Sequence, residues 1–143
     1  MEISVMNKQR KVRFDLAWLR RAADAALAEC VLYSGDEKFS LKKLPLVDVA
    51  VVSDATIARV HVEFMAIPGA TDVITFDHGE IVVSAETALA CAKEHRHSVE
   101  HELALYIIHG LLHLNGFDDT NASAKKKMFR VQDRVWQRVM NIQ

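Results

Sequence analysis

Apolar and polar residues alternate along the chain in two rhythms, one typical of strands and the other of helices. Ile3 and Val5 alternate with polar residues, as do Val12 and Phe14, which predicts one or two short strands near the N-terminus. Residues 16–31 instead place apolar side chains three and four positions apart, which is typical of an amphipathic helix. The chain is therefore expected to begin with strand structure followed by a helix.

The middle of the chain repeats this order. A polar run over residues 35–43 predicts a loop, and the valine-rich segment 46–52 is short enough to be a buried strand rather than a helix. A helix capped by Ser53 or Asp54 is then expected, and it ends before residues 68–69 because the Pro-Gly pair there interrupts the helical pattern.

A hairpin and three helices complete the predicted order. Strands over residues 71–76 and 80–84 are joined by a tight turn. Ser84 is expected to cap a helix over residues 85–95, and Ser98 to cap a second helix that runs to about Leu114 and is ended by Gly116. The last helix is expected to begin at Thr120 or Asn121.

This order predicts one α+β domain over residues 1–143, with a small mixed sheet of about four strands and about five packed helices. Half of the 143 residues are hydrophobic, which is enough for one core. The balance of 18 Lys and Arg against 19 Asp and Glu excludes a strongly basic nucleic-acid wrapper, so contact with RNA has to be local. Without a signal peptide or a long apolar run, we expect a cytoplasmic protein with no membrane partner.

Histidines gather in one stretch of the sequence. Five of the seven lie within residues 95–113. His109 and His113 are four positions apart in a predicted helix, so both imidazoles project from the same face, as two ligands of one metal ion must. Gly116 can take a positive φ and reverse the chain, which brings Asp119 back over that face. The alternative role of Asp119 is to cap the last helix.

Two histidines and one carboxylate leave an open position on a zinc ion, which is the arrangement of catalytic zinc. We therefore expect His109, His113 and Asp119 to bind one zinc ion at the end of the central helix, and we expect hydrolytic chemistry there. The spacing also matches the zinc-protease pattern His-Glu-x-x-His-x-x-Gly-x-x-His, but Gly110 stands where the glutamate base would be. A zinc metallopeptidase is therefore the weaker enzymatic alternative.

Residues 109–119 read His-Gly-Leu-Leu-His-Leu-Asn-Gly-Phe-Asp-Asp. They resemble the hallmark of the YbeY-type endoribonucleases, also called rRNA maturation factors, which reads His-Gly-x-Leu-His-Leu-x-Gly-Tyr-Asp-His. Two further blocks, Thr-Asp-Val-Ile-Thr-Phe at 71–76 and Gly-Glu-Ile-Val-Val-Ser at 79–84, resemble two strands of that family. The resemblance covers the chain from about Asp48 to Asp119.

This resemblance implies a compact α+β fold, a metal held by the signature residues, and cleavage of single-stranded RNA. The implied setting is rRNA maturation, including the 3′ end of 16S rRNA, and ribosome quality control, with RNA and the small ribosomal subunit as partners. Asp119 replaces the family's third metal histidine, which makes divalent metals other than zinc more competitive. The family usually has an arginine a few residues before the Thr-Asp-Val block, and Met65 or Ala66 stands at that position here. Arg59 or a residue from another segment would have to take its role.

Several roles stay open at this level. The general base is unassigned, and either water or the 2′-OH of the RNA is the nucleophile. A ribosome-associated assembly factor with a structural metal is the non-enzymatic alternative. Four other histidines, His78, His95, His97 and His101, are expected to be exposed or locally hydrogen-bonded. A basic row on the last helix is either a solvated face or a guide for RNA, and it consists of Lys126, Arg130, Arg134 and Arg138.

Overall fold

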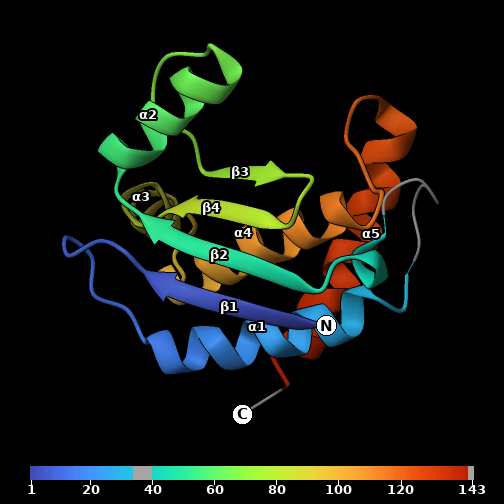
Figure 1. Cartoon of the computed structure of the whole chain (residues 1–143). Helices are drawn as coiled ribbons and strands as arrows, with labels where there is room; N and C mark the ends of the chain where they lie inside the picture. The colour runs from blue at the N-terminus through green and yellow to red at the C-terminus, as the bar shows by residue number, and fades with distance from the viewer. Residues whose placement is uncertain (34–39, 142–143) are drawn as a thin grey trace.

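A four-stranded mixed sheet lies at the centre of the fold in the computed structural model, which describes residues 1–33 and 40–141 (Figure 1). Parallel pairing joins β1 to β2 and β2 to β4, whereas β3 runs antiparallel to β4 as the predicted hairpin requires. The order across the sheet is β1 (Glu2–Asn7), β2 (Leu46–Val52), β4 (Glu80–Ser84) and β3 (Val73–Phe76). The expected α+β class with a mixed four-stranded sheet is confirmed.

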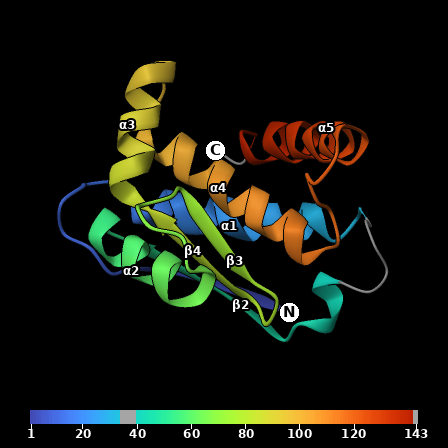
Figure 2. The ribbon, with the colours of Figure 1, turned by 90° about the horizontal axis from the view of Figure 1, so that it is seen from above.

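Helices cover both faces of this sheet. One face carries α1 and α4, against which α5 packs from outside, and α2 lies over the opposite face (Figure 2). None of the helices within the described residues has the length and apolar character needed to cross a membrane. The five helices are α1 (Leu16–Cys30), α2 (Asp54–Met65), α3 (Ala85–His95), α4 (Val99–Leu114) and α5 (Ala122–Val139).

Two sequence expectations need correction. Val12 and Phe14 do not form a second strand. The side chain of Gln9 accepts hydrogen bonds from the backbone N–H groups of Lys11 and Val12 and donates to the carbonyl of Val12, so this backbone is satisfied without a strand partner. In the predicted loop over 35–43, Leu41–Lys43 form one turn of 3₁₀ helix, and the part before residue 40 lies outside the described residues.

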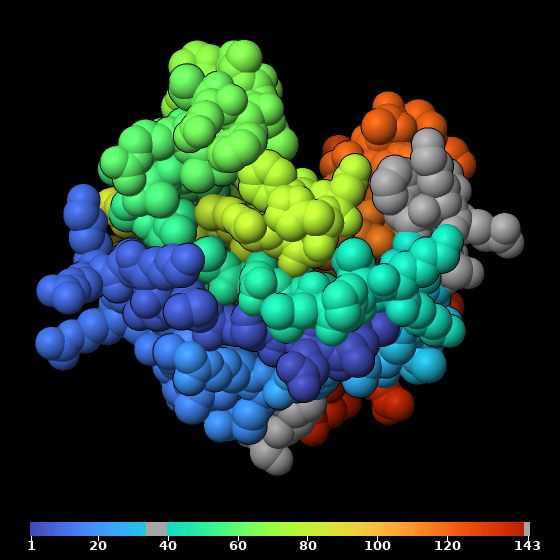
Figure 3. Space-filling model, viewed as in Figure 1, coloured from blue at the N-terminus to red at the C-terminus, as the bar shows by residue number. Residues whose placement is uncertain are grey.

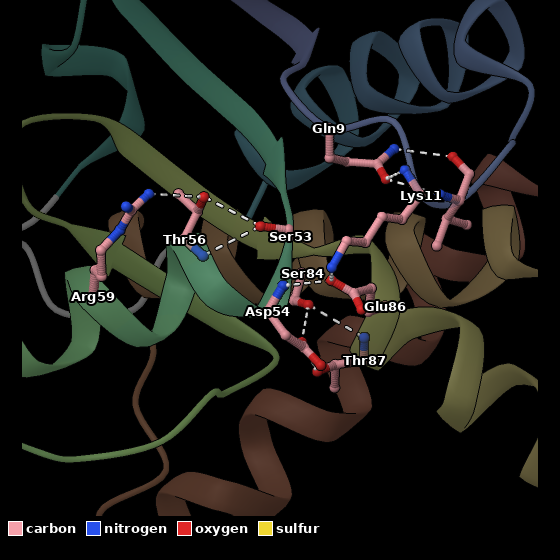
Figure 4. Close-up of polar contacts among 10 residues, drawn as sticks. Gln9, Lys11, Ser53, Asp54, Thr56, Arg59, Ser84, Glu86 and Thr87 are labelled. Atoms are coloured by element: carbon pink, nitrogen blue, oxygen red, sulfur yellow. Dashed lines mark hydrogen bonds and ion pairs between the residues drawn. The ribbon is translucent and has the colours of Figure 1, made fainter.

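The starts of α2 and α3 are joined by side-chain hydrogen bonds (Figure 4). Asp54 accepts from the hydroxyls of Ser84 and Thr87, and the carboxylate of Glu86 accepts from the backbone N–H of Asp54. Ser84 also caps α3 by accepting from the N–H of Thr87. These contacts hold the carboxyl ends of β2 and β4 together, as expected for neighbouring parallel strands.

Gly110 allows α4 to approach the sheet closely. A Cβ atom at this position would lie 2.8 Å from Cδ1 and 3.0 Å from Cγ2 of the buried Ile81 on β4. Real Cβ atoms do not tolerate such distances without a shift of the neighbour. Position 110 therefore faces the sheet, and its glycine sets the distance between α4 and β4.

Candidate metal centre

His109 and His113 lie on one face of α4, as their spacing predicts. Their Nε2 atoms are 3.0 Å apart, and their rings meet edge to face. The Nδ1 atom of His113 lies 3.0 Å from the carbonyl oxygen of Phe117, and Nδ1 of His109 lies 3.3 Å from Oε1 of Gln132. Because these oxygens accept, each Nδ1 is the donor, and each Nε2 carries a lone pair.

This arrangement fits a metal ion. Two lone pairs that face each other at 3.0 Å repel unless a cation or a proton lies between them. Two nitrogens bound to one zinc ion at 2.0–2.1 Å each lie roughly 3 Å apart. Burial, and then the neighbouring His113, lower the pKa of His109, which favours the neutral imidazole that binds metals.

The chain reverses directly after α4. Gly116 has a φ of 91°, the N–H of Phe117 donates to the carbonyl of Leu112 at 3.0 Å, and the N–H of Gly116 donates to the carbonyl of His113. This turn brings Asp119 back toward α4, so that one ligand atom each from His109, His113 and Asp119 lies within 4.8 Å of the other two. The three residues expected to bind the metal are thus neighbours in space.

Asp119 is not the cap of the last helix. The side chain of Asn121 caps α5 by accepting from the N–H of Ala124, and Asp118 accepts from the N–H and hydroxyl of Thr120. These hydrogen bonds lower the pKa of the Asp118 carboxyl. The carboxylate of Asp119 is exposed on the side of the histidines.

Asn115 anchors this end of α4, and sequence reasoning missed it. Its side chain is buried, donates to the backbone carbonyls of Cys30 and Tyr33, and accepts from the N–H of Leu41. It therefore satisfies three backbone groups near the end of α1 and at the start of the 3₁₀ turn. A polar residue before a helix-ending glycine does not by itself indicate a buried anchor, because most such residues are solvated.

A pocket of about 430 Å³ opens beside the two histidines. Figure 3 shows it as a notch between the end of α2 and the segment that leads into α5, with β3 below. Three carboxylates and no lysine or arginine are among its described lining residues, so its own charge repels phosphate. The lining consists of Met65, Asp72, Val73, Ile74, Thr75, Asp77, His109, His113, Gly116, Phe117 and Asp118.

The predicted basic row faces away from this pocket. Its four members are exposed on α5 and lie at least about 120° around the helix axis from Gln132, the residue that contacts His109. Lys125 lies on the near side and lines a narrow crevice with Asp119 and Gln132. The row consists of Lys126, Arg130, Arg134 and Arg138.

The position of the missing family arginine is also clear. Met65 lines the pocket, and Ala66 ends α2 in the left-handed conformation. Arg59 is exposed, and its guanidinium donates to the hydroxyl of Thr56 on the same helix. Arg59 is not among the residues that line the pocket, so it does not take the arginine's place there.

A second group of possible ligands lies where α3 meets α4. One ligand atom each from His95, His97 and Glu102 lies within 4.8 Å of the other two. Both histidines are locally hydrogen-bonded, as expected, but their convergence on a buried glutamate was missed. Sequence reasoning had no reason to single out Glu102, because a glutamate in the first turn of a helix is usually solvated. Of the other two histidines with the same expectation, His78 is exposed and contacts Glu80, whereas His101 is half-buried and stacks between His97 and Trp136.

Comparison with known proteins identifies relatives. A sequence model of the family described as Endoribonuclease YbeY matches residues 4–140. Endoribonuclease YbeY of Mycobacterium bovis is 37% identical over 100 residues, which cover 57% of this chain and 56% of that protein. Endoribonuclease YbeY of Nocardia farcinica is 36% identical over 99 residues, which cover 56% of this chain and 54% of that protein. The chain thus spans little more than half the length of these curated relatives.

A solved structure extends the likeness to the whole fold. The solution structure of TM1509 from Thermotoga maritima superposes with a TM-score of 0.66 at 28% identity. The superposition covers 96% of this chain and 88% of that one. The family match includes every strand and helix that builds the pocket and both histidine groups. The chain belongs to the Endoribonuclease YbeY family.

Proposed function

We propose that this chain is a metal-dependent endoribonuclease that cleaves single-stranded RNA and acts in rRNA maturation, including the 3′ end of 16S rRNA, and in ribosome quality control. The observation that carries the proposal is the convergence of His109, His113 and Asp119 beside an open pocket in a chain of this family. Zinc is the proposed ion, and the Asp119 carboxylate leaves room for another divalent metal.

The protein's own groups prepare this site. His109 and His113 present Nε2 because Gln132 and the carbonyl of Phe117 hold their Nδ1 protons. Asp119 completes the ligand set from the turn after α4. When bound, a divalent ion would supply an activated water or stabilise negative charge on a phosphoryl oxygen. Gly116 and Phe117 form the pocket wall next to these ligands, so a substrate group in the pocket lies beside them.

The charge of the pocket makes RNA binding depend on the ion. Asp72, Asp77 and Asp118 line it, and a phosphate brought near them without a cation is repelled. Lys125 is the basic residue in the crevice beside Asp119, and we propose that it contributes to RNA contact. The row of four basic residues on the far side of α5 then has the weaker, more distant effect.

The environment of Gly110 argues against proteolysis. In the protease pattern a glutamate at this position takes the proton from water, whereas here position 110 faces Ile81 and has no room for a side chain. No observation on the described residues favours a peptidase. The assembly-factor alternative differs from the proposal in lacking cleavage, so an RNA assay separates the two.

The direct test combines metal analysis with RNA cleavage. Wild type, His113→Ala and Asp119→Ala are compared, with His78→Ala as the matched control because His78 is exposed and outside both histidine groups. The proposal expects both site variants to lose metal and cleavage of a single-stranded RNA while the control keeps both. Equal metal content in all four proteins would contradict the site. Ribosome binding without any cleavage by metal-loaded wild type would establish the assembly factor instead.

End groups of the products identify the nucleophile. Attack by the 2′-OH leaves a cyclic phosphate on the upstream fragment, whereas attack by water does not. The same assay on an RNA with a 2′-deoxy nucleotide at the cut site stops the first reaction and permits the second. Either result is compatible with the proposed metal site, and the assay assigns the step.

A further inference from the structure

We propose that His95, His97 and Glu102 form a second divalent transition-metal site, suited to zinc, at the junction of α3 and α4. Of its three residues, Glu102 lies on the same helix as His109, which it precedes by seven residues, or roughly 10 Å along the axis. It is therefore separate from the pocket site. The proposal does not depend on the proposed RNA cleavage.

The ligand set is suited to such an ion. Two imidazoles and one carboxylate are the donors that zinc takes in proteins, and their ligand atoms lie within 4.8 Å of one another. Glu102 is 6% exposed, and a buried carboxylate needs a cation or several hydrogen bonds to offset its desolvation. Its Oε1 lies 2.6 Å from Nε2 of His97, so a bridging ion requires these two atoms to separate by under about 1 Å.

Neighbouring groups hold the histidine rings in place. Nδ1 of His95 lies 4.0 Å from Oε1 of Glu102 and 2.9 Å from the carbonyl oxygen of Cys91, one turn earlier on α3, so metal binding through Nδ1 replaces the hydrogen bond to this carbonyl. The ring of His97 stacks on His101 at 3.8 Å between centroids, and His101 stacks on Trp136 at 3.9 Å. This column connects His97 to α5, so His97 is held by packing as well as by its hydrogen bond to Glu102.

A second observation points to a missing partner at this place. Tyr106 is 7% exposed, and its hydroxyl group is buried without a hydrogen-bond partner among the described residues. Glu102 lies one turn earlier on the same helix. A tyrosine hydroxyl is a hydrogen-bond donor, so it can donate to the Glu102 carboxylate when that carboxylate rotates to bind a metal, as outer groups of metal sites commonly do.

The same geometry without a metal is an ion pair between His97 and Glu102. The two states differ in the number of zinc ions that the protein binds. In the metal state, His109→Ala/His113→Ala removes one zinc per chain and leaves one. In the ion-pair state, this double variant binds none.

The experiment is zinc titration of the purified full chain, with a chromophoric chelator as competitor and metal analysis after dialysis. We expect two zinc ions per chain in wild type and in His78→Ala, one in His109→Ala/His113→Ala, and one in His95→Ala. His97→Gln is the second variant, because glutamine can keep a hydrogen bond to Glu102 without replacing the imidazole ligand.

The affinity of the remaining site completes the test. In the His109→Ala/His113→Ala background, adding His95→Ala or His97→Gln is expected to weaken zinc binding by more than about 100-fold, because a direct ligand is lost. Zinc is also expected to raise the Tm of the background variant and not of the triple variants. Absence of zinc binding by the folded background variant, or unchanged affinity after His95→Ala, would overturn the proposal.

Discussion

The two histidine groups share a ligand composition and differ in their surroundings. His109, His113 and Asp119 lie at the open end of α4, beside a pocket with acidic walls. The other group, at the start of α4, places its carboxylate inside the protein, and one of its histidines lies in an aromatic column against α5. Similar donors thus occur once where a substrate can enter and once where packing is dense.

Under the two proposals above, this difference gives the two groups different roles. A catalytic metal needs an open coordination position and access for the substrate, which the pocket beside His113 provides. A buried carboxylate such as Glu102 suits an ion that joins helices and stays bound. Donor identity alone therefore does not predict chemistry in this fold, and the surroundings of each group decide it.

The largest expected effect separates the groups by cleavage. His109→Ala/His113→Ala is expected to reduce RNA cleavage by more than about 100-fold, because both nitrogen ligands at the pocket are lost. His95→Ala is expected to have a far smaller effect on the rate, because His95 lies outside the pocket lining. Initial rates on a fluorescent single-stranded RNA measure both. Equal losses in the two variants would remove the distinction.

The next largest effect concerns Gln132, whose side chain contacts His109 in the group at the pocket. Gln132→Ala is expected to weaken zinc binding at His109 by about 10–100-fold, because it removes the acceptor that holds the Nδ1 proton. Gln137→Ala, an exposed glutamine on the same helix, is the matched control. Zinc affinity is measured by competition with a chelator, and the affinity of the group of His95, His97 and Glu102 should stay unchanged. A loss as large in the control would show a general effect on α5.

Measurements of stability test how closely α4 packs against β4 at Gly110. Gly110→Ala is expected to lower the free energy of unfolding by about 1–2 kcal/mol, because overpacking against Ile81 exceeds the gain in helix propensity. Urea denaturation measures this change. Ile81→Val removes the nearest atom, so adding it to Gly110→Ala should cost less than it does in wild type. Simple additivity of the two changes would contradict the close approach.

The smallest expected effect is electrostatic. Lys125→Glu is expected to raise the KM for RNA by about threefold or more, because Lys125 lies in the crevice beside Asp119. Arg134→Glu makes the same charge change on the far side of α5 and should have the smaller effect. The comparison is made at low and high salt, since screening reduces both effects. A larger effect of Arg134→Glu would assign RNA contact to the basic row.

Periodicity and capping residues predict most of the fold. The expected caps at Ser53, Ser84 and Ser98 are confirmed, and each accepts from a backbone N–H three residues later. The strand expected at Val12 was wrong because a single side chain, Gln9, satisfies the backbone there. Alternation in a sequence shows which side chains are buried, but it does not show what the backbone is paired with.

The candidate site was predictable where its geometry is local. His109 and His113 share a helix face, and Gly116 reverses the chain within a few residues, so spacing suffices to bring Asp119 near them. Gln132 comes from a different helix, and no periodicity in the sequence specifies which face of α5 meets His109. The group around Glu102 likewise depends on how α3 turns into α4, which is set by packing between helices.

The most direct test of the central claim is RNA cleavage as a function of bound zinc. Wild-type protein is stripped with a chelator and reloaded in steps, and rate and metal content are measured on the same samples. His109→Ala/His113→Ala, purified in parallel, reports contaminating nuclease. We predict no cleavage by the stripped protein and a rate that rises with occupancy of the pocket site. Full cleavage by metal-free wild type, absent from the double variant, would contradict a metal-dependent reaction at this site.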